Sequence, residues 1–377
     1  MLLTCFINGV VVLDDHLVVR FLRHYGQGTL TSIDFSSYPW EILIRQARRT
    51  NLLSRCAFFL CELELLDKVP KQPRIHFINS IKLSDANARS AKVEVKQIYK
   101  ALSKAKVDFV LLKGAAYVWA GNNASKGRLF TDTDILVAKE NLVIAETALA
   151  NSGWLTSSLD VYTQKFYREW MHEIPPMTHL KRQTTIDVHH TIIPPTSRLK
   201  PKPIKFWQQA DAAEDMPGLY VLSPIDMIIH SATHLFHEGE FEQGLRDISD
   251  LDLLIREAIA SQNGWDKLLH RAVELDLVKP VYYALNFTKK ILDAPIPEDV
   301  INRAIFQAKM SKFDVKLMDV LYGRALATNH VTNKMKGQGV ARWFLYIRSH
   351  WLKMPVHLLF PHLFRKSWLN LTGQKDH

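Results

Sequence analysis

Two aspartates one residue apart, Asp132 and Asp134, lead directly into the apolar run 135–137. Alternate residues of a strand face the same side, so both carboxylates can point toward one place. Asp187 lies within a second short apolar run further along the chain, and a strand there could add a third carboxylate. Hard divalent cations bind clustered oxygens, and paired metal ions are the usual means of phosphoryl and nucleotidyl transfer.

The position of these acids favours a metal site over a structural role. Aspartate is depleted in strands, so two at the mouth of a buried strand call for a reason. Three carboxylates around one point would repel each other, and bound Mg²⁺ would remove that repulsion. We therefore predict a Mg²⁺ site at Asp132, Asp134 and Asp187. Structural acids in a solvated turn are the alternative.

The segment that precedes the acids suggests a phosphate-binding turn. Lys113, Gly114 and Ala115 follow the apolar run 107–112, so a strand there feeds a turn or a helix. A glycine lets backbone amides approach phosphate oxygens, and a helix N-terminus adds partial positive charge. Lys113 could also pair with a phosphate directly. A purely structural turn is the alternative.

Charged side chains near the acids are further candidates. Arg128 precedes Asp132 by four residues and could reach a phosphate, pair with the acids, or be a surface guanidinium. His189 alternates with Asp187 along one strand, so it should face the acids as an outer partner, whereas His190 should face the other way.

A later helix carries three histidines on one face. His230, His234 and His237 are spaced i, i+4 and i+7. Three such histidines could bind zinc, but no glutamate separates the first pair as His-Glu-X-X-His chemistry requires, so a packed or substrate-facing helix is favoured. Arg246 and Asp247 are expected near the same cleft, with an ordinary helix-surface pair as the alternative.

The elements that position these residues alternate between strand and helix in mid-chain. Apolar runs predict strands over 107–112 and 129–137, and an amphipathic pattern predicts a helix over 140–151. Segments 178–181 and 184–190 predict an antiparallel pair. Strands mixed with helices in this way indicate an α/β (α+β) unit with a small mixed sheet.

Helices are predicted on both sides of this unit. The first helical pattern runs over 36–66 with a cap at Ser36 or Ser37, and a second runs over 85–104. Ser223 caps a later helix whose periodicity continues to residue 292. We divide the chain into a helical segment 1–88, an α/β core 89–220, a helical domain 221–330 and a basic aromatic tail 331–377.

The composition of the chain narrows the kinds of partner and the cellular location that we expect. The net charge of +10 favours an anionic partner such as a nucleotide, a nucleic acid or a membrane surface, with a merely basic surface as the alternative. Cys5, Cys56 and Cys61 are too few for a disulfide framework and fit a reducing cytoplasm. No uncharged apolar run approaches the ~20 residues that span a bilayer. We predict a cytoplasmic protein that could touch the inner face of the membrane.

The tail suggests three surfaces. Aromatic and basic residues alternate over 342–368, which suits a membrane interface, an apolar cap on the helical domain or a nucleic-acid surface. Of these, a cap on the helical domain is favoured.

The motifs together resemble those of a known family. Leu-Lys-Gly at 112–114, Arg128 with Asp132-X-Asp134, and Asp187-Val-His189 are similar to motifs of the DNA polymerase beta-like nucleotidyltransferase superfamily. More narrowly, the chain resembles the bacterial uncharacterised nucleotidyltransferase family over about residues 36–295. The resemblance implies a small mixed sheet flanked by helices.

The resemblance also implies a reaction mechanism and a role for each candidate site residue. By this resemblance Asp132 and Asp134 hold two Mg²⁺ ions with a nucleoside triphosphate (NTP), and Asp187 completes one metal site and helps deprotonate the attacking hydroxyl. The Gly114 turn would cradle the phosphates, and pyrophosphate would leave as the hydroxyl attacks the α-phosphorus. Many superfamily members have Gly-Ser or Gly-Gly at this turn, whereas Ala115 follows Gly114 here, so a side-chain hydroxyl to the phosphates is missing.

We therefore expect Mg²⁺-dependent transfer of a nucleoside monophosphate from an NTP to a hydroxyl on a small molecule, sugar, protein or RNA end. The alternative is a catalytically silent nucleotide-binding regulator, or a membrane-surface assembly partner organised by the tail. Ala115 favours the silent form, and the presence of all three acids opposes it.

Overall fold

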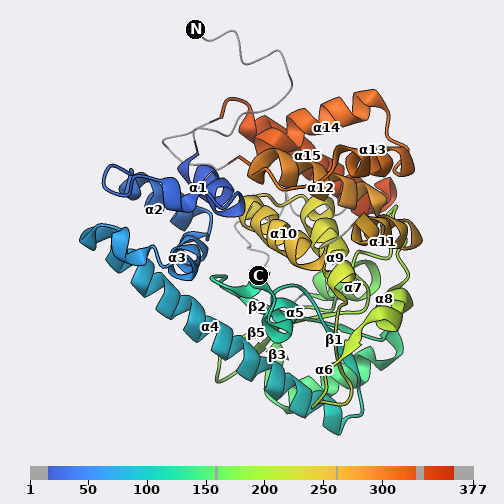
Figure 1. Ribbon diagram of the computed structural model, residues 1–377. Helices are drawn as coiled ribbons and strands as arrows, with labels where there is room; N and C mark the ends of the chain where they lie inside the picture. The colour runs from blue at the N-terminus through green and yellow to red at the C-terminus, as the bar shows by residue number, and fades with distance from the viewer. Residues whose placement is uncertain (1–15, 158–159, 260–261, 328–334, 361–377) are drawn as a thin grey trace.

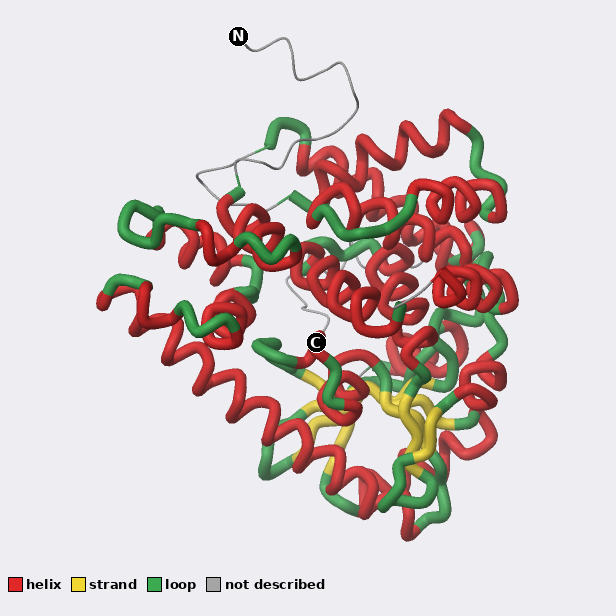
Figure 2. The backbone as a smooth tube through the Cα atoms, in the orientation of Figure 1, coloured by secondary structure: helices red, strands yellow, loops and turns green. Residues whose placement is uncertain are grey.

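The computed structural model describes residues 16–157, 160–259, 262–327 and 335–360. Its strands gather in one mixed sheet on the lower side of the molecule, and the helices of the C-terminal half lie together on the opposite side (Figures 1 and 2). The predicted α/β class is thereby confirmed.

The sheet of the described residues has the strand order β3-β4-β5-β2-β1-β7-β6. Its central strand β2 pairs in parallel with β5 and antiparallel with β1. The predicted pairing of 178–181 with 184–190 is confirmed as the antiparallel pair β4 and β5. The strands are β1 (Phe109–Leu111), β2 (Asp132–Val137), β3 (Trp154–Thr156), β4 (Met177–His179), β5 (Thr185–His189), β6 (Asp211–Ala212) and β7 (Leu219–Val221).

The N-terminal helices differ from the predicted ones. The pattern over 36–66 forms two helices, because Asn51 between them has a left-handed backbone with φ 54°. Neither Ser36 nor Ser37 caps the first of these two helices, since both hydroxyls donate to Asp34. The helices are α1 (Leu17–Gly26), α2 (Trp40–Arg49) and α3 (Leu53–Glu62).

The next helix, α4 (Lys71–Lys104), is one continuous element of 34 residues. The prediction of a separate helix from residue 85 is therefore wrong. Pro73 lies in the first turn, where a missing N–H costs no helical hydrogen bond. The division between residues 88 and 89 consequently falls inside α4, which crosses the molecule beside the sheet (Figure 1).

The remaining helices surround the sheet and build the helical half. The predicted helix over 140–151 is confirmed as α6, and the Ser223 cap is confirmed because its hydroxyl accepts from the Asp226 amide. The helices are α5 (Lys113–Ala120), α6 (Leu142–Asn151), α7 (Val161–Trp170), α8 (Pro203–Gln209), α9 (Pro224–Glu238), α10 (Gly244–Ala258), α11 (Gln262–Glu274), α12 (Val278–Leu292), α13 (Glu298–Gln307), α14 (Lys312–Ala325) and α15 (Gln338–Lys353). The described residues also form the 3₁₀ turns η2 (Leu30–Ser32), η3 (Leu66–Lys68), η4 (Asn123–Ser125) and η5 (Lys139–Asn141).

The main described element of the aromatic tail is the helix α15, which packs against α14 and α9. Its inner face buries Ala341, Leu345 and Ser349, whereas Trp343 and Phe344 are exposed. Residues 361–368 of the predicted aromatic surface lie outside the described residues. Within the described chain, no helix is both long enough and apolar enough to cross a membrane.

Acid should destabilise the fold through the buried His237 on α9. Its ring lies 2.9 Å from the Ser197 hydroxyl, and burial together with the charge of Lys353 lowers its pKa to about 4. Between pH 6.5 and pH 4, His237 is protonated in the unfolded chain but neutral in the folded chain. The free energy of unfolding therefore falls as the pH drops over this range, by about 3 kcal/mol for this group. His237→Gln should lose less stability over this range, measured by urea unfolding. Exposed His270→Gln is the control expected to keep the wild-type slope, and an unchanged slope for His237→Gln would contradict the prediction.

Candidate active site

Strand pairing brings the three predicted acids onto one face of the sheet. Asp134 of β2 lies directly opposite Asp187 of the parallel strand β5, and Asp132 lies opposite Thr185. Residues in register on neighbouring strands share a face, as do residues two apart on one strand. The three carboxylates therefore share the face that the sequence predicts.

Asp134 is the buried centre of this group. Its Oδ1 accepts from Lys113 Nζ at 2.7 Å and lies 3.0 Å from His189 Nε2. Burial would raise the pKa of Asp134, but the Lys113 ammonium and the His189 ring hold this pKa well below its usual range. Asp134 is therefore a carboxylate, and His189 is the outer partner expected from the strand alternation.

Asp187 has a different environment. Its Oδ1 is buried and has no hydrogen-bond partner among the described residues. Burial and the nearby charges of Asp134 and Glu173 raise the pKa of Asp187 to about 7. An unpartnered oxygen and mutual repulsion are what a divalent cation relieves, and the donors are all hard oxygens. The acid face thus fits Mg²⁺.

The turn after β1 differs in detail from the predicted one. The left-handed backbone belongs to Lys113, with φ 45°, and costs about 1–2 kcal/mol in a non-glycine residue. Gly114 is needed for another reason, since a Cβ there would overlap the Phe130 ring. Ala115 is buried and does not line the site cavity. Of the predicted turn residues, the site keeps Lys113 and Gly114.

Among the described residues Arg128 forms no ion pair with the strand acids, and it is not on the surface, so these two predicted alternatives are wrong, whereas contact with a phosphate stays a prediction. Its guanidinium pairs with Asp250 of α10 and lies 4.0 Å from Asp247 Oδ1. The buried Arg55 of α3 shares the same partner, at 2.6 Å from Asp250 Oδ1. Arg128 also lies over the ring of Phe130, with its Cζ 5.7 Å from the centroid. Arg128 therefore lines the site cavity while its guanidinium is held by α10.

A cavity of about 100 Å³ lies between β2, the segment 128–131 and the helices α5, α9 and α10. It combines carboxylates with cationic side chains, which suits a cation together with an anionic phosphate. On its wall, Arg246 donates to Asp247 Oδ1 at 2.8 Å. The lining residues are Lys113, Gly114, Tyr117, Arg128, Leu129, Phe130, Thr131, Asp132, Asp134, Ser231, His234, Arg246, Asp247 and Asp250.

Residues 36–293 match the protein family described as "Uncharacterised nucleotidyltransferase". The chain belongs to this family. The matched span contains the acid face, the Lys113 turn and the whole cavity wall, so the chain is an enzyme of nucleotidyl transfer. A search of curated proteins and a search of solved structures gave no match.

The three histidines on α9 of this nucleotidyltransferase have separate environments. His230 is buried, and His237 lies against Ser197. His234 lines the cavity and lies 3.4 Å from Glu238 Oε2. They do not form a ligand cluster among the described residues. This arrangement agrees with the favoured packed or substrate-facing helix.

A second group of ionisable side chains beside the acid face has no signal in the sequence. Glu173 forms an isolated bridge with His189, and its Oε2 lies 3.4 Å from His189 Nε2 and 3.7 Å from His172 Nε2. His172, Glu173 and His189 each offer an atom within 4.8 Å of the others, a spacing that could hold a metal ion. Glu173 lies outside any regular strand, so periodicity could not place it there. In the nucleotidyltransferase it adds negative charge next to Asp187.

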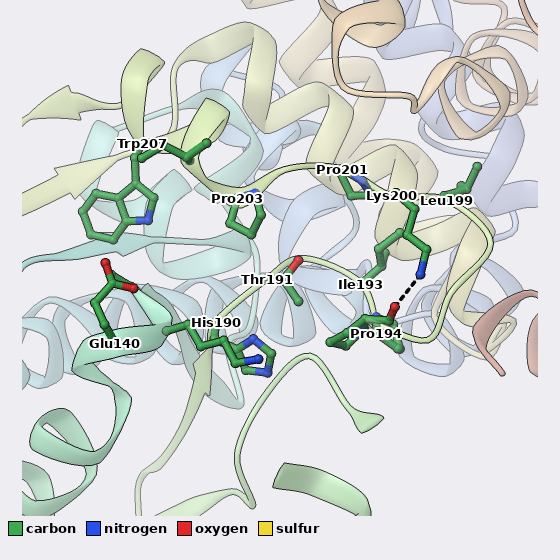
Figure 3. Close-up of a pocket in the computed structure, with 14 residues that line it drawn as sticks. Glu140, His190, Thr191, Ile193, Pro194, Leu199, Lys200, Pro201, Pro203 and Trp207 are labelled. Atoms are coloured by element: carbon green, nitrogen blue, oxygen red, sulfur yellow. Dashed lines mark hydrogen bonds between the residues drawn. The ribbon is translucent and has the colours of Figure 1, made fainter. Parts of the chain in front are cut away.

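A separate cavity of about 470 Å³ lies beyond the C-terminal ends of β2 and β5 (Figure 3). Prolines and Trp207 line it together with His190, which therefore faces away from the acids as predicted. Lys200 Nζ donates to the Pro195 carbonyl there at 2.5 Å. None of the three acids lines this cavity.

Proposed function

We propose that this nucleotidyltransferase moves a nucleoside monophosphate from an NTP to a hydroxyl group at the acid face. The observation that carries the proposal is the unpartnered, buried Oδ1 of Asp187 in register with Asp134. Asp132 and Asp134 would hold two Mg²⁺ ions, and Asp187 would complete one of the two sites. Bound Mg²⁺ would neutralise the triphosphate and offset the charge that develops during transfer.

Cationic side chains of the cavity would bind the triphosphate. Lys113 already points its ammonium at Asp134, and Arg246 lines the same cavity. Asp187 would accept the proton of the attacking hydroxyl. A new bond then forms between the hydroxyl oxygen and the α-phosphorus as the bond to pyrophosphate breaks.

The test uses each of the four NTPs labelled at the α-phosphate, with Mg²⁺ or with chelator, in the presence of a cell extract. We expect label transfer and pyrophosphate release only with the divalent cation. Tight NTP binding without any pyrophosphate release would instead support the silent nucleotide-binding regulator.

Lys113→Met should weaken NTP binding. A charge-assisted hydrogen bond to phosphate contributes about 1.5–3 kcal/mol, so the KM for NTP should rise about 10- to 100-fold. The matched control is Lys200→Met in the separate cavity, which should leave this KM unchanged. An unchanged KM in Lys113→Met, with the fold verified by circular dichroism, would remove Lys113 from phosphate binding.

The tail supports a further proposal, peripheral contact with the inner face of the membrane. Phe344 and Ile347 of α15 are 50% and 44% exposed, and basic residues flank them. Exposed aromatic and basic groups on one helix suit an anionic lipid surface. Co-sedimentation with anionic vesicles tests this contact, and failure to co-sediment would refute it.

A further inference from the structure

The site cavity continues into a larger groove. The groove has a volume of about 630 Å³ and shares His234, Arg246 and Asp247 with the cavity that contains Asp132 and Asp134. Its walls come from the connection between α9 and α10, residues 239–243, and from α15. A molecule in the groove would therefore lie next to the proposed triphosphate position.

Aromatic, acidic and basic side chains together line the groove. Trp343 and Tyr346 of α15 present aromatic rings that are 57% and 38% exposed. Glu240 and Glu242 add carboxylates on the α9–α10 side, and Arg342 adds a guanidinium on the α15 side. Among the residues that the structure describes, no aliphatic side chain lines the groove.

This lining discriminates between the acceptor classes. An RNA end is a polyanion, and Glu240, Glu242 and Asp247 outnumber the arginines along its path. A lipid chain would need aliphatic walls, which the groove lacks. A sugar has C–H faces that pack on aromatic rings, and its hydroxyls both donate to carboxylates and accept from guanidinium groups.

We propose that the groove binds the acceptor and that the acceptor is an uncharged carbohydrate. This inference rests on the proposed nucleotidyl transfer and names its second substrate. A sugar hydroxyl oxygen would bond to the α-phosphorus, pyrophosphate would leave, and the hydroxyl proton would pass to Asp187. The product is a sugar joined to the nucleoside through a phosphodiester.

The α15 wall of the groove comes from outside the matched family region. The family match ends at residue 293, whereas Arg342, Trp343 and Tyr346 belong to α15. On that helix Ala341 and Leu345 are buried, so the aromatic pair is held toward the groove by packing on the opposite face. The shared family region would thus carry the transfer chemistry, and this helix would select the acceptor.

The experiment supplies α-labelled NTP and Mg²⁺ with three groups of probes. These are D-glucose, D-galactose and N-acetylglucosamine, then peptides containing serine or tyrosine, then a short RNA oligonucleotide. We expect label on a saccharide only. Label on a peptide or on RNA would overturn the carbohydrate proposal and leave nucleotidyl transfer standing. Absence of pyrophosphate release with every probe and with cell extract would overturn the proposed function itself.

Variants then locate the acceptor site. Trp343→Ala should raise the KM for the saccharide about tenfold, because it removes one ring face, and should leave the KM for NTP unchanged. Trp351→Ala is the matched control on the same helix: its ring stacks on Arg198 outside the groove, with the Cζ 3.6 Å from the centroid, and both KM values should stay at wild type. An unchanged saccharide KM in Trp343→Ala would overturn the placement of the acceptor in this groove.

Discussion

Replacement of Asp187 by asparagine is expected to lower Mg²⁺-dependent nucleotidyl transfer by about 10³-fold or more. The change removes one negative charge from the acid face and the group that would accept the hydroxyl proton. Loss of several kcal/mol of transition-state stabilisation corresponds to this factor. The fold should tolerate the change, because the Oδ1 of Asp187 has no hydrogen-bond partner among the described residues to lose.

A substitution at Asp187 distinguishes an effect on catalysis from an effect on stability better than a substitution at Asp134 does. Asp134 holds the ammonium of Lys113 at 2.7 Å, so Asp134→Asn would leave a partly buried cation without its counter-charge. A loss of activity in Asp134→Asn would therefore mix two effects. Asp187→Asn lowers the repulsion on the acid face, so its stability without metal should equal or exceed that of wild type.

The measurement is the initial rate of pyrophosphate release, with the melting temperature recorded with and without Mg²⁺. Mg²⁺ should raise the melting temperature of wild type more than that of Asp187→Asn. Asp211→Asn on the exposed edge strand β6 of the same sheet is the control and should keep full activity. If Asp187→Asn retains more than about a tenth of the activity, Asp187 takes no part in the reaction.

The sequence located the acids because their signal is local. A period of two along a strand places Asp132 and Asp134 on one face, and an apolar run on each side of Asp187 marks a second strand. The same rule placed His189 toward the acids and His190 away from them. Helix starts with strong caps were also accessible, as at Ser223.

The residues that hold the site in place could not be predicted from the sequence in this way. Arg128 is bound by Asp250 on a distant helix, and no local pattern links the two. Glu173 joins the acid face through an isolated bridge outside any periodic segment. The role of Gly114 depends on where the Phe130 ring packs, which is a tertiary contact. Long-range pairing of single side chains leaves no spacing rule in one sequence.

Replacement of Asp250 by alanine is expected to cause the largest loss of stability, about 3–5 kcal/mol. The side chains of Arg55 and Asp250 are 1% and 2% exposed, and Arg128 shares the same carboxylate. Alanine would leave the buried guanidinium of Arg55 without its counter-charge, and would leave Arg128 with only the more distant Asp247, at 4.0 Å. The residual bonds of Arg55, to the Ser249 hydroxyl and the Ala124 carbonyl, carry no negative charge to replace it.

Urea unfolding measures this loss, with Glu41→Ala as the matched control. Glu41 pairs with Arg45 on the surface, where the two side chains are 76% and 64% exposed, and such pairs contribute about 0–1 kcal/mol. Adding Arg55→Met to Asp250→Ala should recover part of the loss, because it removes the buried guanidinium that has lost its counter-charge. A loss below about 1 kcal/mol in Asp250→Ala would mean that water or other groups satisfy both arginines. Because Asp250 also lines the site cavity, the double variant should regain stability without regaining full activity: Arg128 would still lack Asp250, the partner that holds it over the Phe130 ring.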